Sequence, residues 1–329
     1  MKIRIGQIGT GHAHASGKMA AMRRSPDFEV VGVGEADPQR RAAAERDRAY
    51  QGTKWLTEEQ LLNVQGLQAV AVETEVCDLL ATAARCVAAG KHIHLDKPAG
   101  ESLSAFKKIL DDATRQGLTV QMGYMFRYNP AFQLSFKAVR EGWLGEVFEV
   151  HTVISKALPA SQRAPLAKYP GGTMFELGCH VIDAVVSVLG KPDRVVPFAR
   201  HSGKFGDDLK DNHLAVFEYP RATATVRSAL LEVEGMQRRQ FVVCGSEGTV
   251  DIRPLEPPAV RLALAQPRGD FRKGYQDVPM PRHSRYDGDF ADLARIIRGE
   301  KPSDFPPAHD LAVQEAVLLA SGLQTEPAG

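Results

Sequence analysis

The stretch "IGQIGTGHAH", residues 5–14, places an apolar run directly before two closely spaced glycines. Gly9 and Gly11 stand where a first strand would turn into a first helix, which the sequence predicts from about residue 15. Glycine suits such a turn because the backbone must bend sharply and direct helix N–H groups at a bound pyrophosphate. His14 replaces the third glycine of the full G-x-G-x-x-G pattern, so the stretch is a partial match to a dinucleotide-binding turn.

The segments after this turn alternate between strand and helix patterns as far as residue 122. The apolar strands "FEVVGVG", "LQAVAVE", "KHIHL" and "LTVQMGY" are separated by helical stretches, which predicts a parallel, doubly wound sheet. Beyond Tyr124 several strand patterns follow one another without long helices, which predicts a mostly antiparallel sheet with helices on one face. We therefore expect an α/β protein with one domain over residues 1–123 and another over 124–329.

The composition is that of an ordinary globular protein. The chain has 329 residues, a formal net charge of +1, and 43% hydrophobic and 25% charged residues. This length favours two domains, and the charge gives no reason to expect a nucleic acid or a membrane as a partner. Cys77, Cys86, Cys179 and Cys244 form no C-x-x-C pair, so we expect reduced cysteines and no metal. No stretch is apolar enough for a signal region or a membrane span, so we expect a cytoplasmic enzyme or binding protein.

Two carboxylates follow the second predicted strand, in "GVGEADP". Glu35 stands where an acidic residue accepts hydrogen bonds from the adenosine ribose, and Asp37 either joins it or begins the next helix with Pro38. A carboxylate at this position repels a 2′-phosphate, so NAD is favoured as the cofactor. NADP stays open because Arg40 and Arg41 are near enough in sequence to reach a phosphate.

Two further stretches carry candidate catalytic groups. "KHIHLDKPAG" ends a predicted parallel strand with Asp96, Lys97 and Pro98, at the sheet edge where ligands bind. "FELGCHVID", residues 175–183, spaces Glu176, His180 and Asp183 four and three positions apart, which places them on one stripe of a predicted helix. From spacing alone, this stripe suits a metal site, buried polar packing or acid–base chemistry.

The order of these motifs, with "GYMFRYNPAF", "EGWLGEVFEV" and "YPGGTMFELGCHVID", resembles the GFO/IDH/MocA oxidoreductases over nearly the whole chain. The resemblance implies an N-terminal Rossmann domain and a C-terminal α/β domain whose large open sheet forms an oligomer interface, as a dimer or tetramer. Lys97 matches the lysine of the family's Glu-Lys-Pro motif, His180 matches its catalytic histidine, and Glu176 stands where the family usually has Asp. Asp96 replaces the usual Glu, and Thr74 matches a cofactor-loop threonine.

These residues together predict reversible NAD-linked oxidation of a hydroxyl group on a sugar, polyol or sugar derivative. His180 would act as the base and Lys97 would stabilise alkoxide charge, while Glu176 and Asp183 would orient His180 or bind neighbouring hydroxyls. Arg127, Tyr128 and Tyr169 are further candidate substrate contacts. The expected cofactor contacts are Gly9, Thr10, Gly11, His12, Glu35, Asp37, Thr74, Asp96 and Lys97.

Three alternatives stay open. Glu176 and His180 at i and i+4 can share a metal ion, and a second histidine group lies in the other domain. The chain can also bind a dinucleotide as a sensor without turnover. Finally, the cofactor can stay bound while an oxidised sugar undergoes elimination or epimerisation. The histidines of that second group are His12, His14, His92 and His94.

Overall fold

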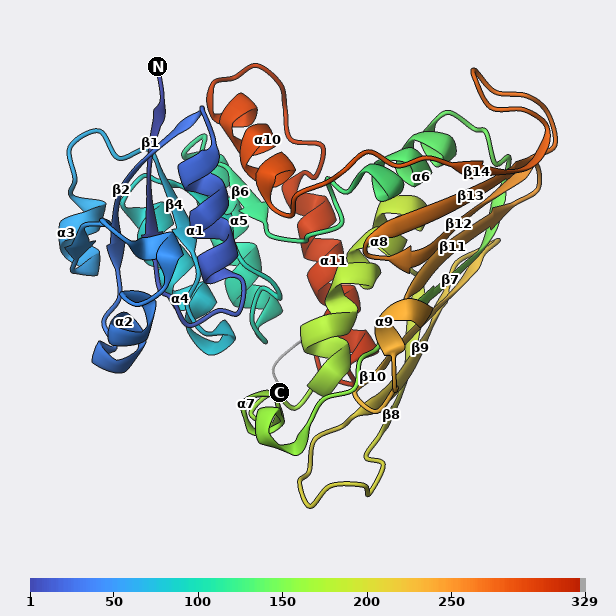
Figure 1. Cartoon of the computed structure of the whole chain (residues 1–329), viewed down its shortest axis with the longest axis horizontal. Helices are drawn as coiled ribbons and strands as arrows, with labels where there is room; N and C mark the ends of the chain where they lie inside the picture. The colour runs from blue at the N-terminus through green and yellow to red at the C-terminus, as the bar shows by residue number, and fades with distance from the viewer. Residues whose placement is uncertain (326–329) are drawn as a thin grey trace. The chain divides into compact units, whose positions relative to one another are not determined.

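A computed structural model describes residues 1–325, which form two compact units (Figure 1). The first unit contains Met1–Met125 and Ser284–Leu311. The second contains Phe126–His283 and residues 312–325. Residues 284–311 thus group with the first unit, whereas the sequence pattern assigns everything after residue 123 to a single second domain.

The first unit is built on a six-stranded sheet in the order β3-β2-β1-β4-β5-β6. Every neighbouring pair in this sheet is parallel, which confirms the predicted doubly wound arrangement. The two-residue strand β3 was not expected from the sequence, because it is too short to show a periodic pattern. The strands are β1 (Ile3–Ile8), β2 (Phe28–Gly34), β3 (Trp55–Leu56), β4 (Ala69–Val72), β5 (His92–Leu95) and β6 (Val120–Met122).

Three helices of the first unit begin at capping side chains, which are Asp37, Thr57 and Ser102. Asp37 caps the helix that follows β2, and Ser102 caps the one that follows β5. The last helix of the unit belongs to residues 284–311 and packs beside the first helix (Figure 1). Its Phe290 ring also lies 5.8 Å from that of Phe28 in β2, between ring centroids. The helices are α1 (Ala15–Arg24), α2 (Pro38–Ala44), α3 (Glu58–Leu62), α4 (Val76–Ala88), α5 (Leu103–Arg115) and α10 (Asp287–Ile297), with a 3₁₀ turn at Arg48–Tyr50.

The second unit is built on an eight-stranded sheet in the order β14-β13-β12-β11-β7-β10-β9-β8. All pairs are antiparallel except β7 with β10, which confirms the mostly antiparallel prediction. Only the edge strand β14 was not expected. The strands are β7 (Val147–Val153), β8 (Arg194–Arg200), β9 (Asn212–Glu218), β10 (Thr223–Ala229), β11 (Gln240–Gly245), β12 (Gly248–Leu255), β13 (Pro258–Leu264) and β14 (Gly274–Val278).

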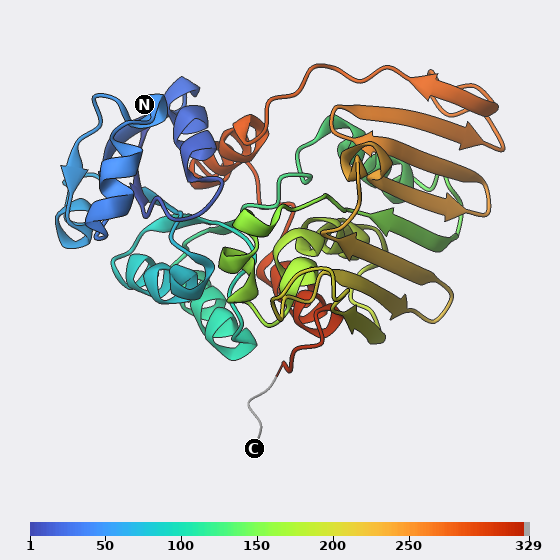
Figure 2. The same cartoon turned by 60° about the horizontal axis from the view of Figure 1, so that its bottom comes forward.

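Two helices of the second unit, α6 (Pro130–Arg140) and α8 (Cys179–Leu189), lie on the same face of this sheet (Figures 1 and 2). A π-helical turn, Met174–Gly178, leads directly into α8. The remaining helices are the single turns α7 (Ala164–Ala167) and α9 (Gly235–Arg238), and α11 (Pro307–Ala320), which begins in the first unit and ends in the second. None of the helices in residues 1–325 is long and apolar enough to cross a membrane.

Candidate active site

The turn between β1 and α1 has the geometry that a dinucleotide requires. Gly9 has φ of 87°, and a Cβ atom at this position would lie only 2.6 Å from the backbone nitrogen of Thr74. The Gly9 N–H donates to the carbonyl of Gly34 at 2.8 Å, and the His12 N–H donates to that of Glu73 at 3.0 Å. The turn is therefore tied to the ends of β2 and β4, and only glycine fits beside Thr74 at position 9.

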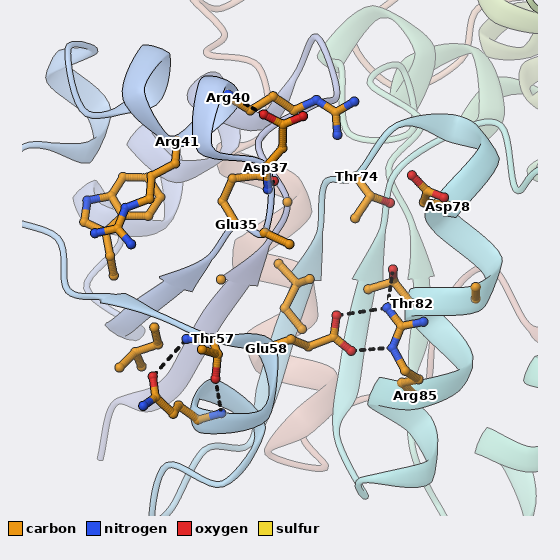
Figure 3. A pocket seen from close by; sticks show the side chains of 18 residues that line it. Glu35, Asp37, Arg40, Arg41, Thr57, Glu58, Thr74, Asp78, Thr82 and Arg85 are labelled. Atoms are coloured by element: carbon orange, nitrogen blue, oxygen red, sulfur yellow. Dashed lines mark hydrogen bonds and ion pairs between the residues drawn. The ribbon is translucent and has the colours of Figure 1, made fainter.

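A cavity of about 550 Å³ opens at the carboxyl ends of β1, β2 and β4 (Figure 3). Among the expected cofactor residues, Gly9, Glu35, Asp37 and Thr74 line it, and its size suits the adenosine half of a dinucleotide. Thr10, Gly11 and His12 line a second cavity of about 330 Å³ on the same turn.

Glu35 and Asp37 hold the backbone around the first cavity. Glu35 Oε2 accepts hydrogen bonds from the N–H and hydroxyl of Thr10, at 2.7 and 2.8 Å. Asp37 accepts from Gln39 N–H and Arg40 N–H, at 2.8 and 3.0 Å, and these bonds keep the pKa of its carboxyl below the usual value. Asp37 is thus the N-cap of α2, which is the alternative role that the sequence left open.

Lys97 follows β5 in a turn with little freedom. Its N–H donates to Asp96 Oδ1 at 2.7 Å, its carbonyl accepts from His12 Nε2 at 3.0 Å, and only 1% of the residue is exposed. Asp96 has no exposed surface, and its Oδ2 lies 2.7 Å from Lys18 Nζ and 2.9 Å from His12 Nδ1. The expected contact between Asp96 and a ribose is not supported by this geometry, because the carboxylate is directed into the protein.

In the second unit, the acid–base stretch is not one regular helix. Glu176 lies in the π-helical turn Met174–Gly178, whereas His180 and Asp183 lie in α8. The single stripe inferred from α-helical spacing is therefore incorrect for Glu176, because the turn before α8 is wound differently. His180 is 1% exposed, with its ring 5.9 Å from that of Phe126 in an edge-to-face contact, and Glu176 is half-buried.

Comparison with known proteins assigns these two units to one family. Residues 3–124 match an oxidoreductase family described by its NAD-binding Rossmann fold, and residues 132–251 match the GFO/IDH/MocA C-terminal domain. The chain belongs to the GFO/IDH/MocA oxidoreductase family. The resemblance inferred from the motifs is thereby confirmed, and the first unit is the NAD-binding Rossmann domain of this oxidoreductase.

Individual members of the family are distant from this chain. The oxidoreductase YhhX of Escherichia coli is 28% identical over 246 residues, which are 66% of this chain and 71% of YhhX. An inositol 2-dehydrogenase of Rhizobium meliloti is 28% identical over 299 residues, or 86% of this chain and 85% of that protein. The solved structure of UDP-N-acetylglucosamine 3-dehydrogenase GnnA from Acidithiobacillus ferrooxidans has a TM-score of 0.80, 16% identity, and coverage of 99% of this chain and 98% of GnnA. That likeness establishes the shared fold.

Two of the expected substrate residues of this GFO/IDH/MocA oxidoreductase are paired with each other. Arg127 and Asp183 are almost fully buried, and the guanidinium donates to both carboxylate oxygens at 2.7 to 3.2 Å. This bidentate pair joins the turn before α6 to α8, and a substrate role of Arg127 and Asp183 stays a prediction. Tyr128 and Tyr169 are half-buried, and the Tyr169 ring lies 6.0 Å from that of Phe175.

The structure reveals a buried polar cluster that the sequence analysis missed, made of Lys18, Glu73 and Asp96 with His12 and His14. Lys18 and Glu73 have no exposed surface, and Lys18 Nζ lies 3.1 Å from Glu73 Oε1. The sequence contains one sign that Lys18 is buried. Lys18 is three residues after Ala15 and four before Met22, which places it on the buried stripe of α1. Glu73, which directly follows the apolar strand β4, gave no distinct signal.

Ionisation in this cluster follows from its burial. Burial and the adjacent Asp96 carboxylate raise the pKa of Glu73 well above its usual range, more than Lys18 lowers it. Burial alone would raise the pKa of Asp96, but Lys18 and the two histidines hold it well below the usual value. Burial lowers the pKa of His14 to about 4, against the opposing effect of Asp96. Burial therefore favours the neutral form of Glu73, whereas the surrounding cationic groups favour the charged form of Asp96.

A metal ion is a poor fit to this cluster. Possible ligand atoms of His12, His14 and Asp96 lie within 4.8 Å of one another. However, the Lys18 ammonium group lies 2.7 Å from Asp96 Oδ2, so a metal cation on that carboxylate would face a fixed positive charge. Within residues 1–325, Glu176 and His180 belong to no group of three or more potential ligands. The helix-based metal alternative stays a prediction, which metal analysis of the purified protein would test.

Proposed function

We propose that the protein transfers a hydride reversibly between NAD and a secondary hydroxyl or keto group of a sugar, polyol or sugar derivative. The observation that carries this proposal is the fixed, buried position of Lys97 at the carboxyl end of β5 in an NAD-binding unit. Ligands of doubly wound sheets bind at this edge. The inositol 2-dehydrogenase named among the relatives supports the substrate class.

The two candidate catalytic residues would divide the proton and charge chemistry. His180 would take the hydroxyl proton during oxidation and return it during reduction. Lys97 would hold the same oxygen and stabilise its negative charge. Glu176 would orient His180 or bind a neighbouring hydroxyl group. When bound, the nicotinamide ring accepts or supplies the hydride.

NAD is the preferred cofactor in this proposal. Arg40 and Arg41 line the cavity (Figure 3). Arg40 Nη2 lies 3.1 Å from Glu75 Oε2, and Arg41 pairs with Glu45 at 2.9 Å while it stacks over Trp55. Both arginines that can recognise a 2′-phosphate thus already have acidic partners, and Glu35 adds negative charge to the cavity. We expect a lower dissociation constant for NADH than for NADPH, measured by fluorescence titration.

The test is turnover of a panel of inositols, aldoses, sugar acids and glycosides with NAD and NADP, with the wild type and two variants. His180→Ala and Lys97→Ala should each lower kcat at least about 100-fold, because each removes a group that acts on the reacting oxygen. Cofactor released on denaturation should be measured in parallel. If either variant keeps wild-type turnover, the proposed roles are wrong.

Two alternatives are distinguished by the same experiment. A protein that binds NADH but turns over nothing in the panel would support the sensor function. Tightly bound cofactor that is released only on denaturation, with a changed sugar and no net NADH, would support oxidation followed by elimination or epimerisation.

We further propose that the protein works in the cytoplasm as a homo-oligomer joined through its antiparallel sheet. The four cysteines are free thiols in the structure, which suits a reducing compartment. Large apolar side chains, Phe198 and Tyr275, are 44% and 59% exposed on β8 and β14 of this sheet. Contact with a second copy would cover them.

A further inference from the structure

We propose that His12 is a positioning residue that couples the dinucleotide-binding turn to Lys97. The inference rests on the proposed function, in which Lys97 is catalytic. His12 itself would contact neither the hydroxyl group nor the hydride. It would act by fixing the backbone from which the Lys97 side chain extends.

A hydrogen bond joins His12 to Lys97. A carbonyl oxygen can only accept, so the 3.0 Å contact between His12 Nε2 and the Lys97 carbonyl requires a proton on Nε2. On the other side of the ring, Nδ1 lies 2.9 Å from Asp96 Oδ2 and 3.3 Å from the His14 backbone nitrogen. Both edges of the ring are therefore held, and the donor to Lys97 has a fixed direction.

The backbone of Lys97 is held at both its N–H and its carbonyl group. Asp96 Oδ1 accepts from the Lys97 N–H at 2.7 Å, while His12 donates to the Lys97 carbonyl. His12 is 9% exposed, and Asp96 and Lys97 are more deeply buried. Removal of the His12 donor would therefore take a hydrogen bond away from the carbonyl group of a buried residue.

His12 is itself part of the dinucleotide-binding turn between β1 and α1. It follows Gly11 directly, and its own N–H is bonded to the Glu73 carbonyl at the end of β4. A pyrophosphate bound at this turn would restrict the same backbone that carries the His12 ring. Cofactor binding and the position of Lys97 would then be linked through one side chain.

The test compares two substitutions that keep different edges of the ring. The amide of Gln reaches the position of His Nε2 and can still donate to Lys97, whereas the amide of Asn reaches only the position of Nδ1. His92 provides the matched control in the same unit, because it is half-buried and its Nδ1 accepts from Thr119 N–H at 3.0 Å without contacting Lys97. The variants are His12→Asn, His12→Gln, His92→Asn and His92→Gln.

We expect His12→Asn to lower kcat about 10- to 100-fold, with the dissociation constant of NADH changed less than about threefold. His12→Gln should restore most of the lost kcat, and both His92 variants should resemble the wild type. Equal losses in His12→Asn and His12→Gln would overturn the proposal. So would a loss confined to NADH affinity, which would make His12 a cofactor ligand.

A second measurement does not depend on turnover. In the wild type and His12→Gln, NAD should shift the backbone amide resonance of Lys97 in NMR spectra, and in His12→Asn this shift should be largely lost while NAD still binds. An unchanged shift in His12→Asn would overturn the coupling. If NAD shifts the resonance as expected but no substrate in the panel is oxidised, the coupling stands and the proposed reaction fails.

Discussion

At the scale of single residues, the most informative position is Glu73. It directly follows four buried apolar residues of β4, yet its carboxyl group lies next to Lys18 and Asp96 with no exposed surface. A buried carboxyl group beside a carboxylate is stable only in its protonated form or with a close cation, and this cluster provides both conditions.

The raised pKa of Glu73 predicts a pH dependence of stability. Near its usual value of 4.5 the unfolded chain releases this proton, whereas the folded protein keeps it to higher pH. The folded state then binds more protons than the unfolded chain. The contribution of Glu73 to the free energy of unfolding therefore falls as pH rises above about 4.5, by up to about 1.4 kcal/mol per pH unit. Glu73→Gln carries no such proton, so it should gain stability relative to the wild type between pH 5 and 8.

Urea unfolding at several pH values measures this difference. A constant difference between Glu73→Gln and the wild type over that range would mean that Glu73 titrates alike in both states.

Gly123, after β6, makes room for the Lys18 ammonium group. A Cβ atom there would lie 2.5 Å from Lys18 Nζ and 3.0 Å from His94 Cε1. Lys18 cannot move away without leaving Glu73 and Asp96, so Gly123→Ala should cost about 1–3 kcal/mol of unfolding free energy. The fluorescence of Trp55 in a Trp143→Phe background reports on this unit. Gly34→Ala is the control in the same unit, because the nearest atom to a Cβ at that position would lie 3.5 Å away, and an equal effect of both substitutions would contradict the steric argument.

At the scale of elements, the helix that carries His180 is held in place by a buried ion pair. Arg127, before α6, and Asp183, in α8, are 0% and 1% exposed in their side chains, with a shortest contact of 2.7 Å. The π-helical turn before α8 has more residues per turn than an α-helix, so its side chains are rotated relative to those of α8. Such turns are frequent at functional sites. The pair and the turn together set the direction in which α8 presents His180 within its unit.

Arg127→Met should therefore destabilise the second unit by about 3–5 kcal/mol, because it removes the guanidinium group that faces the buried Asp183 carboxylate. The double variant Arg127→Met/Asp183→Leu should recover part of this loss. Urea unfolding followed by Trp143 fluorescence in a Trp55→Phe background measures both. Lys191→Met breaks the exposed pair with Glu315 and should change stability by less than about 1 kcal/mol; a similarly small effect of Arg127→Met would show that the buried pair is not needed.

At the scale of the whole molecule, the second sheet presents a continuous row of side chains opposite its buried face. Strand pairing aligns these residues across five neighbouring strands, and all of them are half-exposed. The residues between them in the same strands, such as Phe217 and Val226, are fully buried. The row contains Val196, Val216, Thr225, His151 and Val242.

This row predicts how the proposed oligomer can be disrupted. Val242→Glu places a charge in the middle of the row and should weaken self-association at least about tenfold, measured by sedimentation velocity. Val233→Glu, at a residue that is 80% exposed, is the control for folding and should associate like the wild type. A monomeric wild type would contradict the proposed interface.

The sequence by itself determined most of the fold. Glycine spacing in residues 5–14, apolar strands separated by capped helices, and the change of rhythm near Tyr124 predicted both sheets, because these signals arise from local backbone preferences and periodic burial. The sequence also indicated that Gly9, Glu35 and Lys97 lie at strand ends, where a ligand of such a sheet binds. Gly9 and Glu35 line the cavity there.

Only the tertiary structure decided which polar groups pair. Arg127 with Asp183, and Lys18 with Glu73 and Asp96, are 56, 55 and 78 residues apart, and no local pattern encodes which distant side chains meet. The same holds for the return of residues 284–311 to the first unit and for the hydrogen bond from His12 to Lys97. Burial removes water as a partner, so each of these polar groups must find its partner within the fold.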